Sequence, residues 1–82
     1  MNSLAAKAFV LIETAVGRAM EVAAALQKLE GVKSVDPVTG PYDIIAIVEG
    51  KNLNVIGDLV TGNIHPISGI SRTVTCLAIW GD

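Results

Sequence analysis

The sequence predicts one α+β domain whose elements follow the order strand, helix, strand, strand, helix, strand. Apolar residues alternate between short β-prone runs and helical spacing along the chain, and turn signals separate the segments. The chain has 82 residues, of which 51% are hydrophobic and 17% charged. A chain of this length forms a single domain, and its low charge excludes intrinsic disorder.

The first two elements are a strand and a helix. Residues 6–14 are apolar and β-prone, with apolar side chains on both faces of the expected strand. In residues 18–30 the apolar positions recur at helical spacing, which indicates an amphipathic helix. Gly31 follows, and glycine commonly ends a helix in a left-handed conformation.

A hairpin is expected next. Residues 32–39 form the second predicted strand, and Pro37 places it at a sheet edge because proline lacks a backbone donor. Residues 40–43, Gly-Pro-Tyr-Asp, are a strong turn signal. The third predicted strand, residues 44–48, is again apolar on both faces. The short turn makes the two strands antiparallel.

The second helix and the last strand complete the order. The helix is predicted over residues 52–64, where Gly57 and Gly62 each weaken it by up to ~1 kcal/mol relative to alanine. Packing must therefore hold this helix in place. Pro66 marks its end, and residues 70–80 form the last predicted strand.

With right-handed crossovers, this order gives a ferredoxin-like βαββαβ fold with a four-stranded antiparallel sheet. Residues 6–14 and 44–48 become the central strands, and the other two strands become the edges. Two helices cover only one face, yet the central strands are apolar on both faces. The sequence therefore predicts a dimeric α+β barrel, in which the open face packs against the same face of a second copy.

Composition weakens the case for several function classes. Six basic against eight acidic residues give a net charge of −2, which disfavours direct nucleic-acid binding. The longest apolar runs are five residues, whereas a membrane-spanning helix needs roughly 20. The N-terminus lacks the features of a signal peptide, and the single cysteine, Cys76, has no internal partner. A cytoplasmic protein that binds no membrane is expected.

Residues typical of catalysis or of cofactor binding are few. His65 is the one histidine, and Cys76 lies in the middle of a predicted strand. No cysteine or histidine spacing suggests zinc, and no glycine pattern suggests a nucleotide. We therefore expect no enzyme activity, metal or cofactor. A small enzyme with a polar cavity between sheet and helices, and a purely structural assembly unit, remain the alternatives.

Two segments have the chemistry of a ligand site. In the turn at residues 40–43, Gly40 allows close backbone approach, backbone amides suit an anion, and the Asp43 carboxylate suits an ammonium group. Asp43 as a local turn cap and Tyr42 as a packing residue are the alternatives. On the last strand, hydroxyls at alternate positions share one face, although threonine is also simply a good strand residue. The candidate binding residues are Gly40, Pro41, Tyr42, Asp43, Ser71, Thr73 and Thr75.

Several segments together resemble the effector-binding domain of the Lrp/AsnC transcription regulators, called the regulation-of-amino-acid-metabolism (RAM) domain. They are Ala-Phe-Val-Leu-Ile-Glu-Thr at 8–14, Gly31-Val32, Val-Thr-Gly-Pro-Tyr-Asp-Ile-Ile-Ala at 38–46, and Ser68-Gly69-Ile70 followed by Thr73-Val74-Thr75. The resemblance covers essentially the whole chain, so residues 6–80 are assigned to this domain and residues 1–5 and 81–82 to termini. Full-length members carry a helix-turn-helix domain before this unit, and the resemblance here implies a stand-alone member.

The resemblance also implies a function. Such domains bind free amino acids as effectors without catalysis, form homodimers through their sheets, and assemble into rings of dimers. Their ligand site lies between dimers and maps onto residues 40–43 and the Ser71, Thr73 and Thr75 face. A stand-alone member is expected to act in regulation of transcription or of amino acid metabolism, by joining or competing with full-length Lrp/AsnC regulators.

Overall fold

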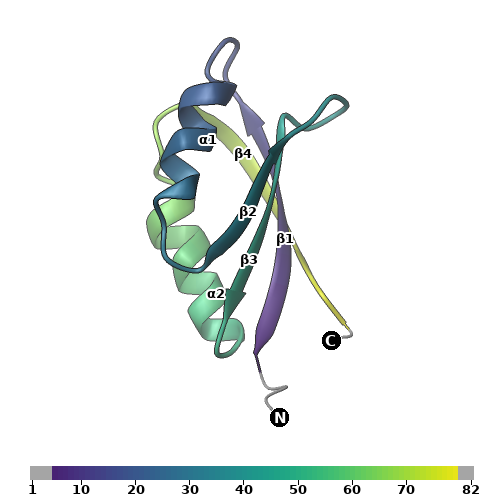
Figure 1. The fold of residues 1–82 in the computed structure, drawn as a ribbon, viewed down its shortest axis with the longest axis vertical. Coiled ribbons are helices and arrows are strands. Elements are labelled where there is room, and N and C mark those ends of the chain that lie inside the picture. Colours follow the sequence, from purple (N-terminus) through teal and green to yellow (C-terminus); the bar gives the residue numbers. More distant parts are fainter. Residues whose placement is uncertain (1–4, 80–82) are drawn as a thin grey trace.

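The computed structural model describes residues 5–79 and contains the predicted elements in the predicted order. They are β1 (Ala6–Thr14), α1 (Ala19–Gln27), β2 (Val32–Pro37), β3 (Ile44–Gly50), α2 (Leu53–Leu59), the π-helix η1 (Val60–Ile64) and β4 (Ile70–Leu77). The strands form one antiparallel sheet in the order β2–β3–β1–β4 (Figure 1). The ferredoxin-like topology, with β1 and β3 in the centre, is confirmed.

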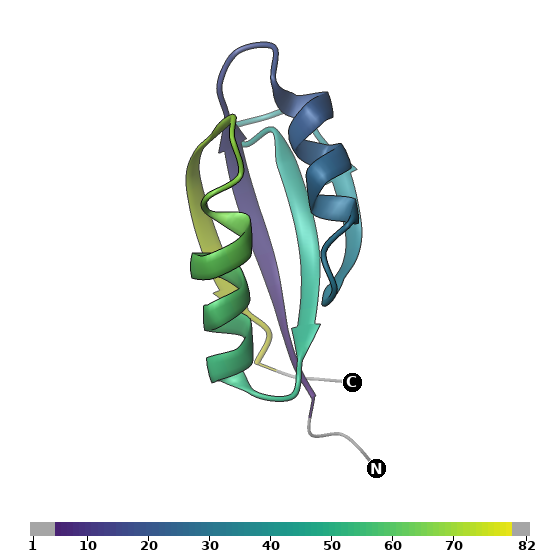
Figure 2. The ribbon, with the colours of Figure 1, turned by 90° about the vertical axis from the view of Figure 1, so that its left-hand side faces the viewer.

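Both helices lie on one face of the sheet, and the core lies between the two layers (Figure 2). The α1 helix packs beside β2, whereas α2 lies over β1 and β3. This arrangement buries the inward-facing side chains of the two central strands together with the apolar stripes of the helices. The core residues, each at most 5% exposed, are Ala8, Val10, Ile12, Val22, Ala23, Leu26, Ile44, Ala46, Val48, Ile56 and Ile64.

The opposite face of the sheet is also apolar, and no helix of the described chain covers it. Phe9 pairs with Ile47, and Leu11 pairs with both Ile45 and Val74. Paired residues share a face, and the four on β1 and β3 alternate with the core residues along their strands, while Val74 shares their face through its pairing with Leu11. All five are half-buried in the single chain. We call them the open face, and they confirm that the central strands are apolar on both sides.

The second helix is expected to be continuous over residues 52–64, but the structure divides it into α2 and the π-helix η1. Asn52 caps its start by accepting a hydrogen bond from the Val55 backbone N–H at 2.9 Å. After Leu59 the chain widens into the π-helix η1, where the backbone N–H of His65 donates to the carbonyl of Val60 at 2.7 Å. Pro66 has no N–H to continue the helical ladder, so the helix ends in this wide turn.

The remaining predicted ends shift by a few residues. The first helix ends at Gln27 instead of residue 30, because the chain must reverse before Gly31, which adopts a φ of +95°. The second strand ends at Pro37 instead of residue 39, and the third extends to Gly50. The last ends at Leu77, and the predicted extension to Trp80 lies outside the described residues, as do positions 1–4, 81 and 82 of the predicted termini. Between residues 5 and 79, no helix has the length and apolarity needed to cross a membrane.

Arg18 ties the start of α1 to the loop that precedes β4. Its guanidinium donates to the Glu21 carboxylate at 2.6 Å and to the Ser68 hydroxyl at 2.9 Å. The hydrogen bond from Arg18 lowers the pKa of Glu21. Both side chains of this ion pair are solvent-exposed, so the pair adds little stability. The same loop is held by the Ala15 N–H, which donates to the Gly69 carbonyl at 2.8 Å.

We expect Gly69→Ala to destabilise the fold more than Gly17→Ala. Both glycines have positive φ, +101° and +78°, which costs an L-residue roughly 1–2 kcal/mol. At Gly69 an added Cβ would also lie 2.9 Å from Val22 Cγ2 and 3.2 Å from Arg18 Cβ, whereas at Gly17 it would meet nothing within 4 Å. Urea denaturation of both variants measures the difference. Equal losses would show that the contact with Val22 is not tight.

Candidate functional site

Polar side chains gather at the C-terminal end of β1, where the β2–β3 hairpin and the start of β4 come together. The site contains one carboxylate, one guanidinium, one phenol and two aliphatic hydroxyls. We call it the β1-end cluster, and it consists of Thr14, Tyr42, Asp43, Ser71 and Arg72.

Asp43 fastens the hairpin to β1. Its backbone N–H donates to the Ile12 carbonyl at 2.9 Å. Its Oδ2 accepts hydrogen bonds from the Thr14 backbone N–H at 2.8 Å and from the Thr14 hydroxyl at 3.3 Å. The carboxylate therefore caps a residue far away in sequence rather than its own turn. Within the described chain, Oδ1 accepts no hydrogen bond and is available to a further donor.

Tyr42 and Arg72 meet across the end of the sheet. The Arg72 guanidinium donates to the Tyr42 hydroxyl at 3.1 Å, and its central carbon lies 5.9 Å from the centre of the Tyr42 ring. This is the geometry of a cation–π contact. The cluster thus contains a guanidinium bonded to Tyr42 and a carboxylate bonded to Thr14, at the same end of the sheet. The sequence pattern missed Arg72, because alternation placed it on the face opposite Ser71 and Thr73.

The hydroxyl residues of β4 do not all join the cluster. Ser71 does, since its hydroxyl donates to the Glu13 carbonyl at 3.0 Å beside a β-bulge. Thr73 pairs with Ile12, and Thr75 pairs with Val10, so both lie on the helix-covered face.

Two further candidate residues, Gly40 and Pro41, are exposed in the loop between β2 and β3. Gly40 has a φ of +135°, which favours glycine. None of the cluster's hydrogen bonds involves either residue, so they border the cluster only through their chain neighbour Tyr42.

Thr75 and Asp43 lie far apart in a single chain. Asp43 bonds to Thr14, whereas Thr75 pairs with Val10, four residues earlier along β1. At about 3.3 Å per residue this separation is roughly 13 Å along the strand, before the width of the sheet is added. One free amino acid does not bridge that distance. Tyr42, Asp43 and Ser71 therefore belong to the cluster, whereas Thr75 lies in a second place, and Thr73 belongs to neither.

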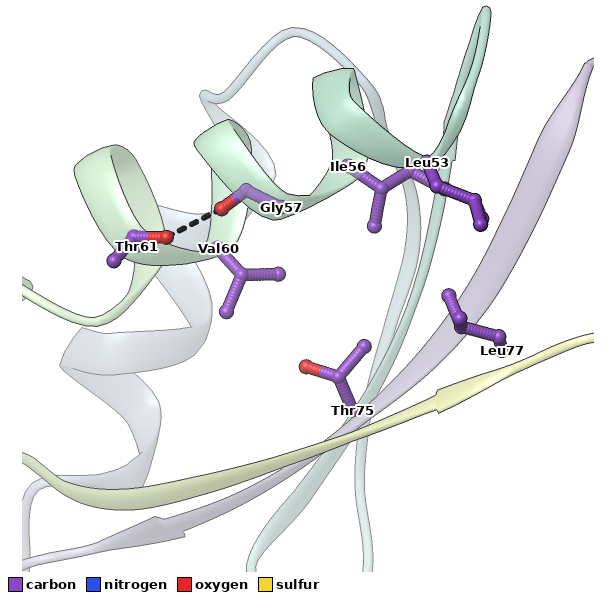
Figure 3. Close-up of a pocket in the computed structure, with 7 residues that line it drawn as sticks. All are labelled: Leu53, Ile56, Gly57, Val60, Thr61, Thr75 and Leu77. Carbon is purple, nitrogen blue, oxygen red and sulfur yellow. Dashed lines mark hydrogen bonds between the residues drawn. The ribbon is translucent and has the colours of Figure 1, made fainter.

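The second place is a groove between α2 and β4 with a volume of about 300 Å³ (Figure 3). It exists because α2 lies over β1 and β3 and leaves the inner side of β4 uncovered. Figure 3 shows Thr75 and Leu77 pointing from β4 towards the helix. The residues that line the groove are Leu53, Ile56, Gly57, Val60, Thr61, Thr75 and Leu77.

The groove is uncharged and mostly apolar. Of its two hydroxyls, that of Thr61 donates to the Gly57 carbonyl at 2.5 Å. The other, that of Thr75, has no hydrogen-bond partner among residues 5–79. Over the same part of the chain, no three His, Cys, Asp or Glu side chains gather as a metal site requires. The sequence pattern missed the groove, because it depends on where α2 sits on the sheet.

Comparison with known sequences assigns the domain type. A family model described as the Lrp/AsnC ligand binding domain matches residues 7–79. An uncharacterised helix-turn-helix-type transcriptional regulator of Pyrococcus furiosus, PF0250, is 34% identical over 58 residues, 71% of this chain and 39% of that protein. The homocitrate synthase of Sulfurisphaera tokodaii is 37% identical over 54 residues, 66% of this chain and 12% of that enzyme. The chain thus spans less than half the length of either curated relative.

Solved structures agree with this assignment. The protein TTHA0845 from Thermus thermophilus is 38% identical with a TM-score of 0.88, and the match covers 94% of this chain and 96% of that one. The transcriptional regulator NMB0573 of Neisseria meningitidis, solved in complex with L-Met, has a TM-score of 0.83 at 20% identity. That match covers 93% of this chain and 51% of the regulator, and it concerns the fold alone. Because the family model matches nearly the full length, the chain belongs to the Lrp/AsnC ligand-binding domain family.

Proposed function

We propose that this chain is an amino-acid-binding effector module that acts, as an oligomer, in regulation of transcription or of amino acid metabolism. The observation that carries the proposal is the β1-end cluster, which presents a carboxylate and a guanidinium within a ligand-binding domain. These two groups complement the ammonium and carboxylate of a free amino acid. The module binds its effector without catalysing a reaction.

The chemistry of an amino acid sets what the site must provide. Burying either charged end without a partner is costly, and charge-assisted hydrogen bonds offset that cost. Oδ1 of Asp43 accepts from the ammonium group, while Oδ2 stays on Thr14. The carboxylate receives hydrogen bonds from Arg72 and from backbone N–H groups of the 40–43 turn. Gly40 allows the close approach, and Pro41 contributes no donor.

The relatives support a role in regulation of transcription as well as one in regulation of amino acid metabolism. A regulator with this fold has been solved with L-Met, which shows that the fold accommodates an amino acid in that protein. One curated relative is a transcriptional regulator, and the other is a biosynthetic enzyme that contains a matching segment. A module of this type therefore accompanies DNA-binding proteins as well as enzymes.

An oligomer completes the proposal. The open face, made of Phe9, Leu11, Ile45, Ile47 and Val74, consists of apolar side chains that are only half-buried in the single chain, which favours packing on the same face of a second copy. Full-length Lrp/AsnC regulators contain a domain of the same fold, and this likeness supports the proposal that the chain joins or competes with them. In a ring of dimers, the ligand lies between subunits, and the separated cluster and β4 hydroxyls then come from different chains.

The alternatives from the sequence have less support. A dimeric α+β barrel enzyme needs a polar cavity between the sheet and the helices. The α2–β4 groove, which the described residues form there, has mostly apolar walls and no charged side chain. A structural assembly unit accounts for the bonds from Thr14 to Asp43 and from Arg72 to Tyr42, but it gives no role to Oδ1 of Asp43, which accepts no hydrogen bond within the described chain.

A thermal-shift screen of the twenty amino acids tests the proposal. A ligand at about 100 times its dissociation constant adds ~2.7 kcal/mol to a folded protein that alone binds it. Each kcal/mol corresponds to roughly 4–8 °C for a domain of this size. We expect at least one amino acid to raise the melting temperature clearly, and its carboxamide and its des-amino analogue to have much smaller effects. The absence of any shift would contradict the proposal and favour the structural unit.

A further inference from the structure

We infer that the α2–β4 groove receives the side chain of an uncharged aliphatic amino acid, and that Gly57 sets the largest side chain admitted. The inference rests on the proposed function and specifies its ligand class. The β1-end cluster of the same chain is too distant, so the charged ends of that amino acid are held by the cluster of a neighbouring subunit.

The lining of the groove selects against charge. None of the seven lining residues is ionisable, and four of them, Leu53, Ile56, Val60 and Leu77, are branched aliphatic residues. A lysine or aspartate side chain there would lose its hydration without gaining a partner of opposite charge. Burial of aliphatic carbon is favourable by ~25 cal/mol per Å². Apolar side chains of moderate size, such as those of leucine, isoleucine and methionine, therefore fit best.

The size of the groove agrees with a single side chain. Its volume of about 300 Å³ is at the lower end of the range for small-molecule pockets, ~300–1,000 Å³. The Thr75 hydroxyl, which has no partner among the described residues, is left to hydrogen-bond the polar part of the ligand.

Gly57 opens the helix side of the groove. An added Cβ at this position would meet no heavy atom within 4 Å, although Gly57 lines the groove. A side chain at position 57 would therefore fill groove volume without displacing the protein. Gly62 is equally free of contacts but does not line the groove, which makes it a matched control on the adjoining π-helix η1. Both glycines cost helix stability, ~1 kcal/mol each relative to alanine.

Calorimetric titration of the intact oligomer tests this inference. The probes are leucine, isoleucine and methionine, with alanine as a small probe and lysine and aspartate as charged ones. We expect wild type to bind the aliphatic set at least about tenfold more tightly than lysine or aspartate, because a charged side chain would lose its hydration in the groove without gaining a partner of opposite charge. Gly57→Leu should weaken the aliphatic set about tenfold or more and leave alanine within about threefold. Gly62→Leu should change neither.

Gly57→Ala serves if Gly57→Leu does not fold, and it should weaken isoleucine and methionine more than alanine. Preference for lysine or aspartate, or equal effects of Gly57→Leu and Gly62→Leu, would overturn the inference while the proposed function stands. If Gly57→Leu changes only the sedimentation of the oligomer, the groove holds a second copy and the inference is wrong. If no probe binds wild type and none of the twenty amino acids shifts its melting temperature, the proposed function fails as well.

Discussion

Replacing Leu11 with lysine is expected to dissociate the oligomer into folded monomers. Leu11 lies in the centre of the open face, paired with Ile45 on one side and Val74 on the other. Packed against a second copy, a lysine there would bury an unpaired charge at a cost of several kcal/mol. Since about 1.4 kcal/mol is tenfold in affinity, the dimer should weaken at least about a hundredfold. In the single chain Leu11 is only half-buried, so a lysine reaches solvent and the fold persists.

Sedimentation velocity at micromolar concentration measures this effect. Wild type should sediment as a dimer or a multiple of it, and Leu11→Lys as a monomer with an unchanged circular dichroism spectrum. Val16→Lys is the matched control, because Val16 is fully exposed in the loop after β1 and the same chemical change there should leave the oligomer intact. A monomeric wild type would refute the sheet-to-sheet arrangement, as would a Leu11→Lys variant that remains dimeric.

Asp43→Asn is expected to weaken amino acid binding about thirtyfold or more while preserving the fold. Asparagine keeps an oxygen that accepts from the Thr14 N–H, but it removes the charge that faces the ammonium group. Loss of one partner of a buried, hydrogen-bonded charge pair costs about 2–5 kcal/mol, which is about thirtyfold or more in affinity. Asp43→Ala should in addition destabilise the fold by about 1–3 kcal/mol, because the Thr14 N–H loses its partner.

Titration of the amino acid that gives the largest thermal shift checks this prediction. Thr14→Val is the control, since it removes the 3.3 Å hydroxyl bond to Asp43 and keeps the backbone bond, so affinity should stay within a few-fold of wild type. If Asp43→Asn binds as tightly as wild type, the site assignment at the 40–43 turn is wrong. The structural assembly unit then becomes the better account.

Most of the fold could be predicted from the sequence because the buried side chains are apolar and recur with the period of a strand or a helix. The doubly apolar runs at 6–14 and 44–48 mark central strands, and Pro37 marks an edge. The division of the second helix into α2 and η1 could not be predicted, since the spacing of Ile56 and Ile64 suits either form. The π-type hydrogen bond from the His65 N–H to the Val60 carbonyl depends on how this segment packs in the folded chain.

The candidate site was only partly predictable. Turn chemistry, together with the family resemblance, pointed to residues 40–43 and to the β4 hydroxyls. The partners that define the cluster are distant in sequence, because Thr14 meets Asp43 and Arg72 meets Tyr42 only after the sheet has formed. The groove depends on an even more global feature, the position of α2 over the sheet, so no local pattern signals it.

The most direct measurement of the central claim is a crystal structure of the oligomer grown with the amino acid that gives the largest thermal shift. The effector-module account predicts the ligand between subunits, with its ammonium group within hydrogen-bond distance of Asp43 and its carboxylate near Arg72 and the 40–43 turn. Its side chain should enter the α2–β4 groove. A ligand bound elsewhere, or an empty site at saturating concentrations of each of the twenty amino acids, would contradict the account.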